Sequence, residues 1–165
     1  MQNYNRVITA LFFCLSGIVS AQQIQTDRPN ETEGPSSVSK YVLQVESGFS
    51  FEEKDSEKTY GIPEIVLRYG LFKNAELRLE SVLQTTNAEN STYGFKALTF
   101  GFKYHLVDHA NLVPDIALLG RISIPWLADN VYQEPKYQPE VRLLFQHELS
   151  KSSHIGYNAG MHWTA

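Results

Sequence analysis

The chain has 165 residues, a formal net charge of −4 and a single cysteine, Cys14. This mildly acidic balance argues against a nucleic-acid partner, because phosphate recognition requires a basic surface. One cysteine cannot form an internal disulfide, and the sequence lacks a glycine-rich phosphate loop and zinc-type ligand spacing. We therefore expect neither a cofactor nor a metal.

Residues 1–21 are predicted to form a secretory signal peptide. Arg6 is their only charged residue, Val7 to Val19 form an apolar stretch, and Ala21 ends a run of small residues suited to cleavage. The stretch is shorter than the roughly 20 apolar residues of a transmembrane helix, although an uncleaved N-terminal anchor is the alternative. Cleavage would remove Cys14 and Arg6, which would change the charge from −4 to −5.

Residues 22–40 are polar and contain Pro29, Pro35 and two adjacent serines. This composition predicts an extended leader in the periplasm and not a folded domain. The remaining residues, 41–165, are predicted to form one β-barrel domain.

Seven segments of this domain alternate between apolar and polar residues with the period of a β-strand. The segments are 41–52, 64–69, 75–83, 97–104, 115–124, 140–149 and 155–164. One flank of these strands contains no Asp, Glu, Lys or Arg. The charged residues all lie on the other flank: Glu46, Glu52, Glu64, Arg68, Glu76, Arg78, Glu80, Lys103, Asp115, Arg121, Glu140, Arg142 and Glu148.

A sheet with one apolar and one polar face is typical of an antiparallel, up-and-down transmembrane β-barrel, which is the all-β fold class that we expect. Connections that alternate between short and long place the N-terminus in the periplasm. Seven strands are an odd number, whereas bacterial barrels have even numbers. We therefore expect an incomplete barrel that is truncated at its C-terminus.

The rival fold is a soluble lipid carrier, a barrel that turns its apolar face inward around a ligand. The choice between Arg and Lys favours the membrane, because Arg pairs with carboxylates bidentately where charges are enclosed. Four of the six Arg residues lie on the polar flank, but only one of the eight Lys residues, Lys103, does.

Pairing the second and third strands about residues 71–73 places Arg68 opposite Glu76 and sets Arg78 among Glu64, Glu80 and Glu46. This arrangement predicts an ion-pair lattice inside a narrow lumen. The residues expected to line the lumen and select solutes are Glu46, Glu64, Arg68, Glu76, Arg78, Glu80, Arg121, Glu140 and Arg142.

The leader also carries a family signature. Thr26, Asp27, Arg28 and Pro29, followed by the segment 31–35, resemble the opening "TDRP…T…P" of an outer-membrane group labelled as a MetA pathway of phenol degradation. The acidic residue and glycine of the first strand fit the same group, whereas Gly34 departs from its commoner serine. The resemblance implies a barrel in the outer membrane of a Gram-negative bacterium, with passage of small solutes, aromatic compounds among them.

Two other functions remain open on the residues alone. Ser123, Glu140 and His162 lie on the polar flank of the last three strands, and such a trio could serve an outer-membrane acyl hydrolase. The charged lumen could also belong to a structural barrel that is closed and conducts nothing. We predict a non-enzymatic passive channel whose partners are outer-membrane lipid and a small solute. The five His residues do not have the spacing of a metal site.

Overall fold

The computed structural model describes residues 32–54, 57–87, 91–110, 112–150 and 152–164. The predicted signal peptide, 1–21, and the motif residues Thr26, Asp27, Arg28 and Pro29 lie outside the described residues. None of the described residues belongs to a helix of the length and apolarity needed to cross a membrane.

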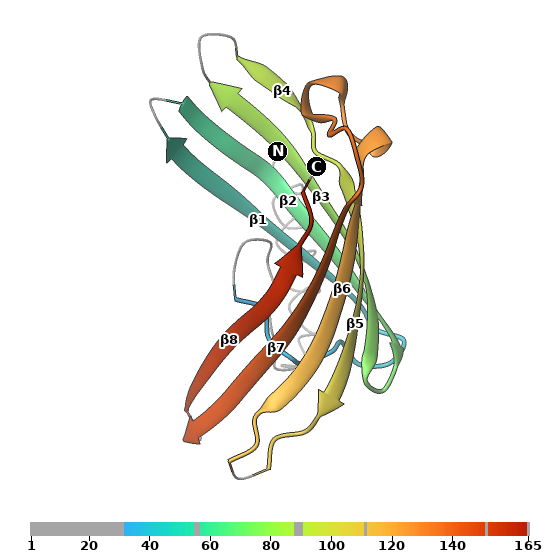
Figure 1. The fold of residues 1–165 in the computed structure, drawn as a ribbon, viewed down its shortest axis with the longest axis vertical. Coiled ribbons are helices and arrows are strands. Elements are labelled where there is room, and N and C mark those ends of the chain that lie inside the picture. The colour runs from blue at the N-terminus through green and yellow to red at the C-terminus, as the bar shows by residue number, and fades with distance from the viewer. Residues whose placement is uncertain (1–31, 55–56, 88–90, 111, 151, 165) are drawn as a thin grey trace, which may run out of the picture.

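The described chain forms one curled antiparallel sheet, the wall of a half-barrel (Figure 1). Its strands are β1 (Leu43–Lys54), β2 (Glu57–Phe72), β3 (Ala75–Asn87), β4 (Thr92–Phe95), β5 (Leu98–Val107), β6 (Asp115–Ile124), β7 (Gln138–Ser150) and β8 (Ser153–His162). Two short 3₁₀ turns, η1 (Pro125–Leu127) and η2 (Asn130–Tyr132), lie between β6 and β7. Neighbours in the sheet follow the order β1-β2-β3-β5-β6-β7-β8, and β4 pairs with β3 beyond the end of β5. The expected all-β, up-and-down antiparallel fold is confirmed.

Two strand predictions needed correction. β6 has the predicted bounds, but β2 begins at Glu57, whereas the prediction placed its start at Glu64. Pro63 lies inside β2, where the pairing with β3 shifts between Gly61 and Glu64. An irregularity of this kind tolerates proline, because no ladder hydrogen bond is needed there. The short strand β4 was also missed, since it lies in a stretch read as connection.

The two faces of the sheet differ in exposure as the alternation predicted. Apolar side chains on one face are open to the surroundings, for example Phe49 at 74% and Val45 at 62% exposed. Charged side chains on the other face are buried, with Arg68 at 2% and Glu76 at 0%. This charged face is the concave one, because Arg78 of β3 and Arg121 of β6 both reach the carboxylate of Glu33. A soluble carrier with its apolar face inward is therefore excluded for the described residues.

Residues 32–40 of the leader lie across the concave face. Their backbone meets β2 at Gly70, where Lys40 forms a parallel bridge, and the chain then turns into β1 at Tyr41. Tyr41 has a φ of 64°, a left-handed conformation that is uncommon outside glycine. The leader was not expected to contact the predicted lumen face.

Apolar packing contributes little to the interior. The hydrophobic cluster formed by buried residues of the described chain contains only Ala117, Leu119 and Leu144. Buried polar and charged residues outnumber the buried hydrophobic ones on the described chain. The concave side is therefore organised by charge pairing and hydrogen bonds.

Candidate functional site

One group of ion pairs on the concave face is centred on Arg68 of β2. Its guanidinium donates to both carboxylate oxygens of Glu76, from Nε and Nη2, each at 2.9 Å. Nη1 donates to Glu46 Oε1 at 2.9 Å, and Nη2 also reaches the carbonyl oxygen of Ser36 at 3.2 Å. This bidentate geometry is the one that distinguishes Arg from Lys. Arg68 thus connects β1, β3 and the leader.

Glu76 also forms ion pairs with Arg78 on its own strand, β3, and with Lys103 on β5. Its Oε1 lies 3.6 Å from both Arg78 Nη1 and Lys103 Nζ, and its Oε2 accepts a hydrogen bond of 2.7 Å from the backbone N–H of Val38. Lys103 Nζ donates in turn to the carbonyl oxygen of Gly34 at 3.0 Å. The Glu76 carboxylate therefore meets three cations, Arg68, Arg78 and Lys103, and the leader at one buried point.

Glu33 of the leader joins distant strands. Its Oε1 accepts from Arg121 Nη1 of β6 at 2.8 Å, and its Oε2 lies 3.6 Å from Arg78 Nη1 of β3. The amide of Asn158 on β8, in the orientation that pairs both of its polar atoms, donates to Glu33 O at 3.1 Å and accepts from Glu33 N at 3.0 Å. One residue spans β3, β6 and β8 only because the sheet curls around it.

Arg121 of β6 forms ion pairs with carboxylates on β3 and β7. Nη2 donates to Glu140 Oε1 and Oε2 at 3.0 and 2.9 Å, and Nη1 lies 3.3 Å from Glu80 Oε2. Glu140 also pairs with Arg142. Gly101 of β5 leaves room for this crossing, since a Cβ there would lie 3.2 Å from side-chain atoms of both Arg121 and Arg78.

We call these ten residues the lattice: Glu33, Glu46, Arg68, Glu76, Arg78, Glu80, Lys103, Arg121, Glu140 and Arg142. Five are carboxylates and five are cations, so the lattice has no formal net charge. Such compensation matters because an unpaired charge in an enclosed site is costly.

The predicted register within the lattice is wrong in one detail. Arg68 stands opposite Arg78 and not opposite Glu76, because the pairing of β2 and β3 shifts between Gly70 and Phe72. Arg68 still binds Glu76 diagonally. Of the neighbours predicted for Arg78, only Glu80 contacts it, through Oε1 at 3.2 Å from Nε.

The other two predicted neighbours of Arg78 have different partners. Glu46 binds Arg68, as described above. Glu64 accepts a hydrogen bond of 2.5 Å from Ser50 Oγ, and no ion pair of the described chain involves it. Glu64 is therefore on the predicted face but outside the lattice.

Sequence reasoning missed two members of the lattice. Glu33 was noticed only as part of the leader motif, and Lys103 only as the single lysine of the polar flank. Both are fully buried, at 1% and 0% exposed. Because Lys103 is the only lysine on an arginine-rich flank, the sequence could have indicated that its side chain is buried. The contacts of Glu33 could not be predicted, since the leader has no periodic pattern.

The structure gives no support to the hydrolase trio. Ser123 Oγ lies 2.7 Å from Thr99 Oγ1, and Glu140 is held by two arginines. Among the hydrogen bonds of the described residues, none joins Ser123 to His162.

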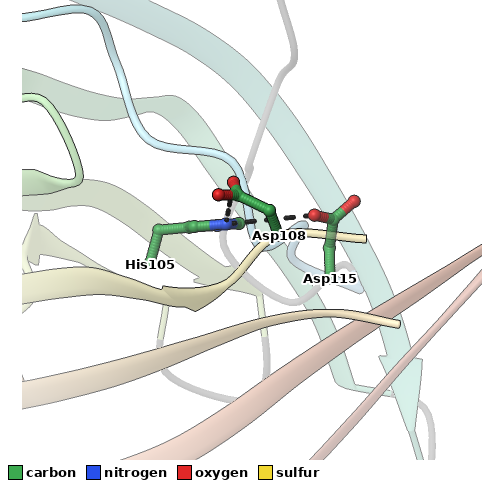
Figure 2. A group of neighbouring side chains, drawn as sticks. All are labelled: His105, Asp108 and Asp115. Atoms are coloured by element: carbon green, nitrogen blue, oxygen red, sulfur yellow. Dashed lines mark hydrogen bonds and ion pairs between the residues drawn. The ribbon is translucent and has the colours of Figure 1, made fainter. Parts of the chain in front are cut away.

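A second polar group lies at the turn between β5 and β6 (Figure 2). His105 Nε2 is 3.0 Å from Asp108 Oδ1 and 3.9 Å from Asp115 Oδ1, and the backbone N–H of His109 donates to Asp115 Oδ1 at 2.8 Å. Spacing in the sequence did not indicate this group, because the turn brings its members together.

The long connection between β6 and β7 folds back onto β3 and β4. The Asp129 carboxylate accepts from the backbone N–H of Phe95 at 2.7 Å, and Tyr132 Oη lies 3.0 Å from Thr92 Oγ1. These bonds fix the connection over one rim of the sheet.

Comparison with curated proteins and with solved structures gives no match. The family model described as "Putative MetA-pathway of phenol degradation" matches residues 26–165, which is most of the chain. It covers the leader from residue 26 onward, all eight strands and every residue of the lattice. The chain therefore belongs to this family.

Proposed function

We propose that the protein is an outer-membrane β-barrel, exported through its N-terminal signal, that provides a passive path for small solutes. The observation that supports the proposal most is the division of the sheet into two faces. On the described strands, the exposed convex face carries charge only near the β1–β2 turn, at Glu53 and Lys58, whereas the concave face is buried and charged. A barrel with this division has hydrocarbon outside and a polar lumen inside.

The convex face suits lipid. Its exposed side chains include Leu77, Phe100, Phe102 and Leu118, and an Arg or Lys there would cost about 2–4 kcal/mol at the bilayer midplane. Exposed tyrosines lie near the end of the sheet that holds the β2–β3 turn, for example Tyr69 and Tyr104. Aromatic rings at this level match the headgroup region of a membrane.

The lattice indicates the kind of solute. Because its charges compensate one another, it offers a polar, shaped surface and little net field for collecting ions. We therefore infer that the path suits small uncharged solutes, aromatic compounds included.

The position of the leader favours a second candidate, a barrel with a closed lumen. Residues 33–38 contact lattice members on β2, β3, β5 and β6, with distances between 2.7 and 3.6 Å. A segment held this firmly on the polar face narrows the space left for solute. On this alternative the lattice anchors the leader, and the protein conducts only after the leader has moved.

Liposome swelling with uncharged solutes of increasing size separates the two candidates. Wild-type protein should admit small solutes such as phenol-sized alcohols if the path is open. A closed barrel should give no swelling until Glu33→Ala weakens the binding of the leader to the concave face. Ser47→Ala, on the exposed convex face, is the matched control and should leave a closed barrel closed. Absence of uptake in both wild type and Glu33→Ala would contradict the channel proposal.

A further inference from the structure

We propose that His105, Asp108 and Asp115, the turn cluster, bind a divalent transition-metal ion. His105 is near the end of β5, Asp115 opens β6 and Asp108 lies in the turn between them. One ligand atom from each lies within 4.8 Å of the other two, and Figure 2 shows the three side chains converging.

The His105 ring lies between two oxygen atoms. Its Nδ1 lies 3.2 Å from the carbonyl oxygen of Pro35, and its Nε2 lies 3.0 Å from Asp108 Oδ1. A carbonyl oxygen and an ionised carboxylate accept hydrogen bonds and donate none, whereas a neutral imidazole has a single N–H to donate. Only one of the two nitrogens of a neutral ring can donate to these oxygens, and the lone pair of the other is available to a metal ion.

A metal ion at Nε2 satisfies both contacts. The ring then carries its proton on Nδ1 and donates it to Pro35 O, which is the arrangement that orients most metal-bound histidines. Asp115 is oriented in the same way, because its Oδ1 accepts from the backbone N–H of His109. The cluster therefore has oriented ligands as well as close ones.

The ligand set selects the class of ion. One imidazole nitrogen and two carboxylates suit Zn²⁺, whose bonds of about 2.0–2.2 Å place tetrahedral ligand atoms about 3.3–3.5 Å apart. The separations of 3.0 and 3.9 Å from His105 Nε2 bracket that spacing. Asp108 is open to solvent at 95% side-chain exposure, so a water can complete the coordination. Ca²⁺ and Mg²⁺ prefer oxygen ligands alone.

The ion would also act on the leader. Pro35 belongs to the segment that covers the lattice, and its carbonyl oxygen accepts from the His105 tautomer that the metal fixes. If metal binding is tighter with the leader docked, docking is favoured by the same factor, because the coupling is reciprocal. Metal binding would thereby hold the leader on the concave face.

Binding can be measured directly by titrating chelator-treated, detergent-solubilised protein with Zn²⁺ in a calorimeter at fixed pH. Asp108→Asn and His105→Gln should each weaken the affinity by at least about tenfold, as is usual when a metal site loses a ligand or its support. His154→Gln, an exposed histidine outside the cluster, should leave the affinity unchanged. Equal binding by all four proteins, equal loss in His154→Gln, or no Zn²⁺ binding by wild type would each overturn the proposal.

The effect on the leader has a separate readout. In a Cys14→Ser background, Val38→Cys places a thiol on a leader residue that is 6% exposed. Zn²⁺ should slow maleimide labelling of this thiol, and Asp108→Asn should abolish the slowing. Labelling that is indifferent to Zn²⁺ in a protein that binds it would show that the ion does not hold the leader.

Discussion

Replacing Arg68 by Leu should be among the most destabilising single changes on the concave face. Among the described residues, the substitution removes four hydrogen bonds: two to Glu76, one to Glu46 and one to Ser36 O. It leaves two carboxylates that are 0% and 6% exposed without this cation. Breaking a buried ion pair costs about 3–5 kcal/mol, and the expected loss of unfolding free energy lies in this range.

Two further variants calibrate this value. Arg68→Lys keeps the charge and loses the bidentate geometry, so about 1–3 kcal/mol should be lost. Arg142→Leu is the matched control, because its side chain is 28% exposed and its ion pair is with Glu140. Partly exposed pairs contribute about 0–1 kcal/mol.

The assay is guanidinium unfolding in detergent, followed by the fluorescence of the two tryptophans, Trp126 and Trp163. The predicted order of stability is wild type, then Arg142→Leu, then Arg68→Lys, then Arg68→Leu. If Arg68→Leu costs no more than Arg142→Leu, the lattice does not stabilise the concave face and the reasoning fails.

Three other changes test separate parts of the structure. Gly70→Ala would place a Cβ 2.1 and 2.6 Å from two leader carbonyl oxygens, so it should cost about 1–3 kcal/mol and speed labelling of a leader thiol at position 38. Gly120→Ala, which meets nothing within 4 Å, should do neither. Phe100→Arg on the convex face should destabilise the protein in lipid vesicles by about 2–4 kcal/mol, whereas Leu112→Arg in an exposed turn should change stability by less than about 0.5 kcal/mol. Arg142→Glu should shift the reversal potential of planar bilayers toward cation preference, and an unchanged potential would remove Arg142 from the solute path.

The alternation of residues predicted the fold and its two faces, because strand parity is a local property of the sequence. It predicted the bounds of β6 and the enclosure of Arg68, Arg78 and Arg121. The partners of each charge depend on register, and one shift near Leu71 moved Arg68 from opposite Glu76 to opposite Arg78. A period of two residues does not reveal such a shift.

The contacts of the leader and of the turn between β5 and β6 could not be predicted from the sequence, because these segments have no alternation of apolar and polar residues. Docking of the leader depends on the curl of the whole sheet, which brings Arg78 and Arg121 to the same carboxylate of Glu33. The turn cluster depends on how the chain folds between β5 and β6. The spacing of His105, Asp108 and Asp115 in the sequence does not define that fold.

The most direct test of the account measures which flank of β7 contacts hydrocarbon. Spin labels at consecutive positions from Val141 to Gln146, in protein reconstituted into vesicles, report collisions with oxygen, which concentrates in lipid. Oxygen accessibility should be high at Val141, Leu143 and Phe145 and low at Arg142, Leu144 and Gln146. The reverse phase, or no alternation, would contradict a lipid-facing apolar flank.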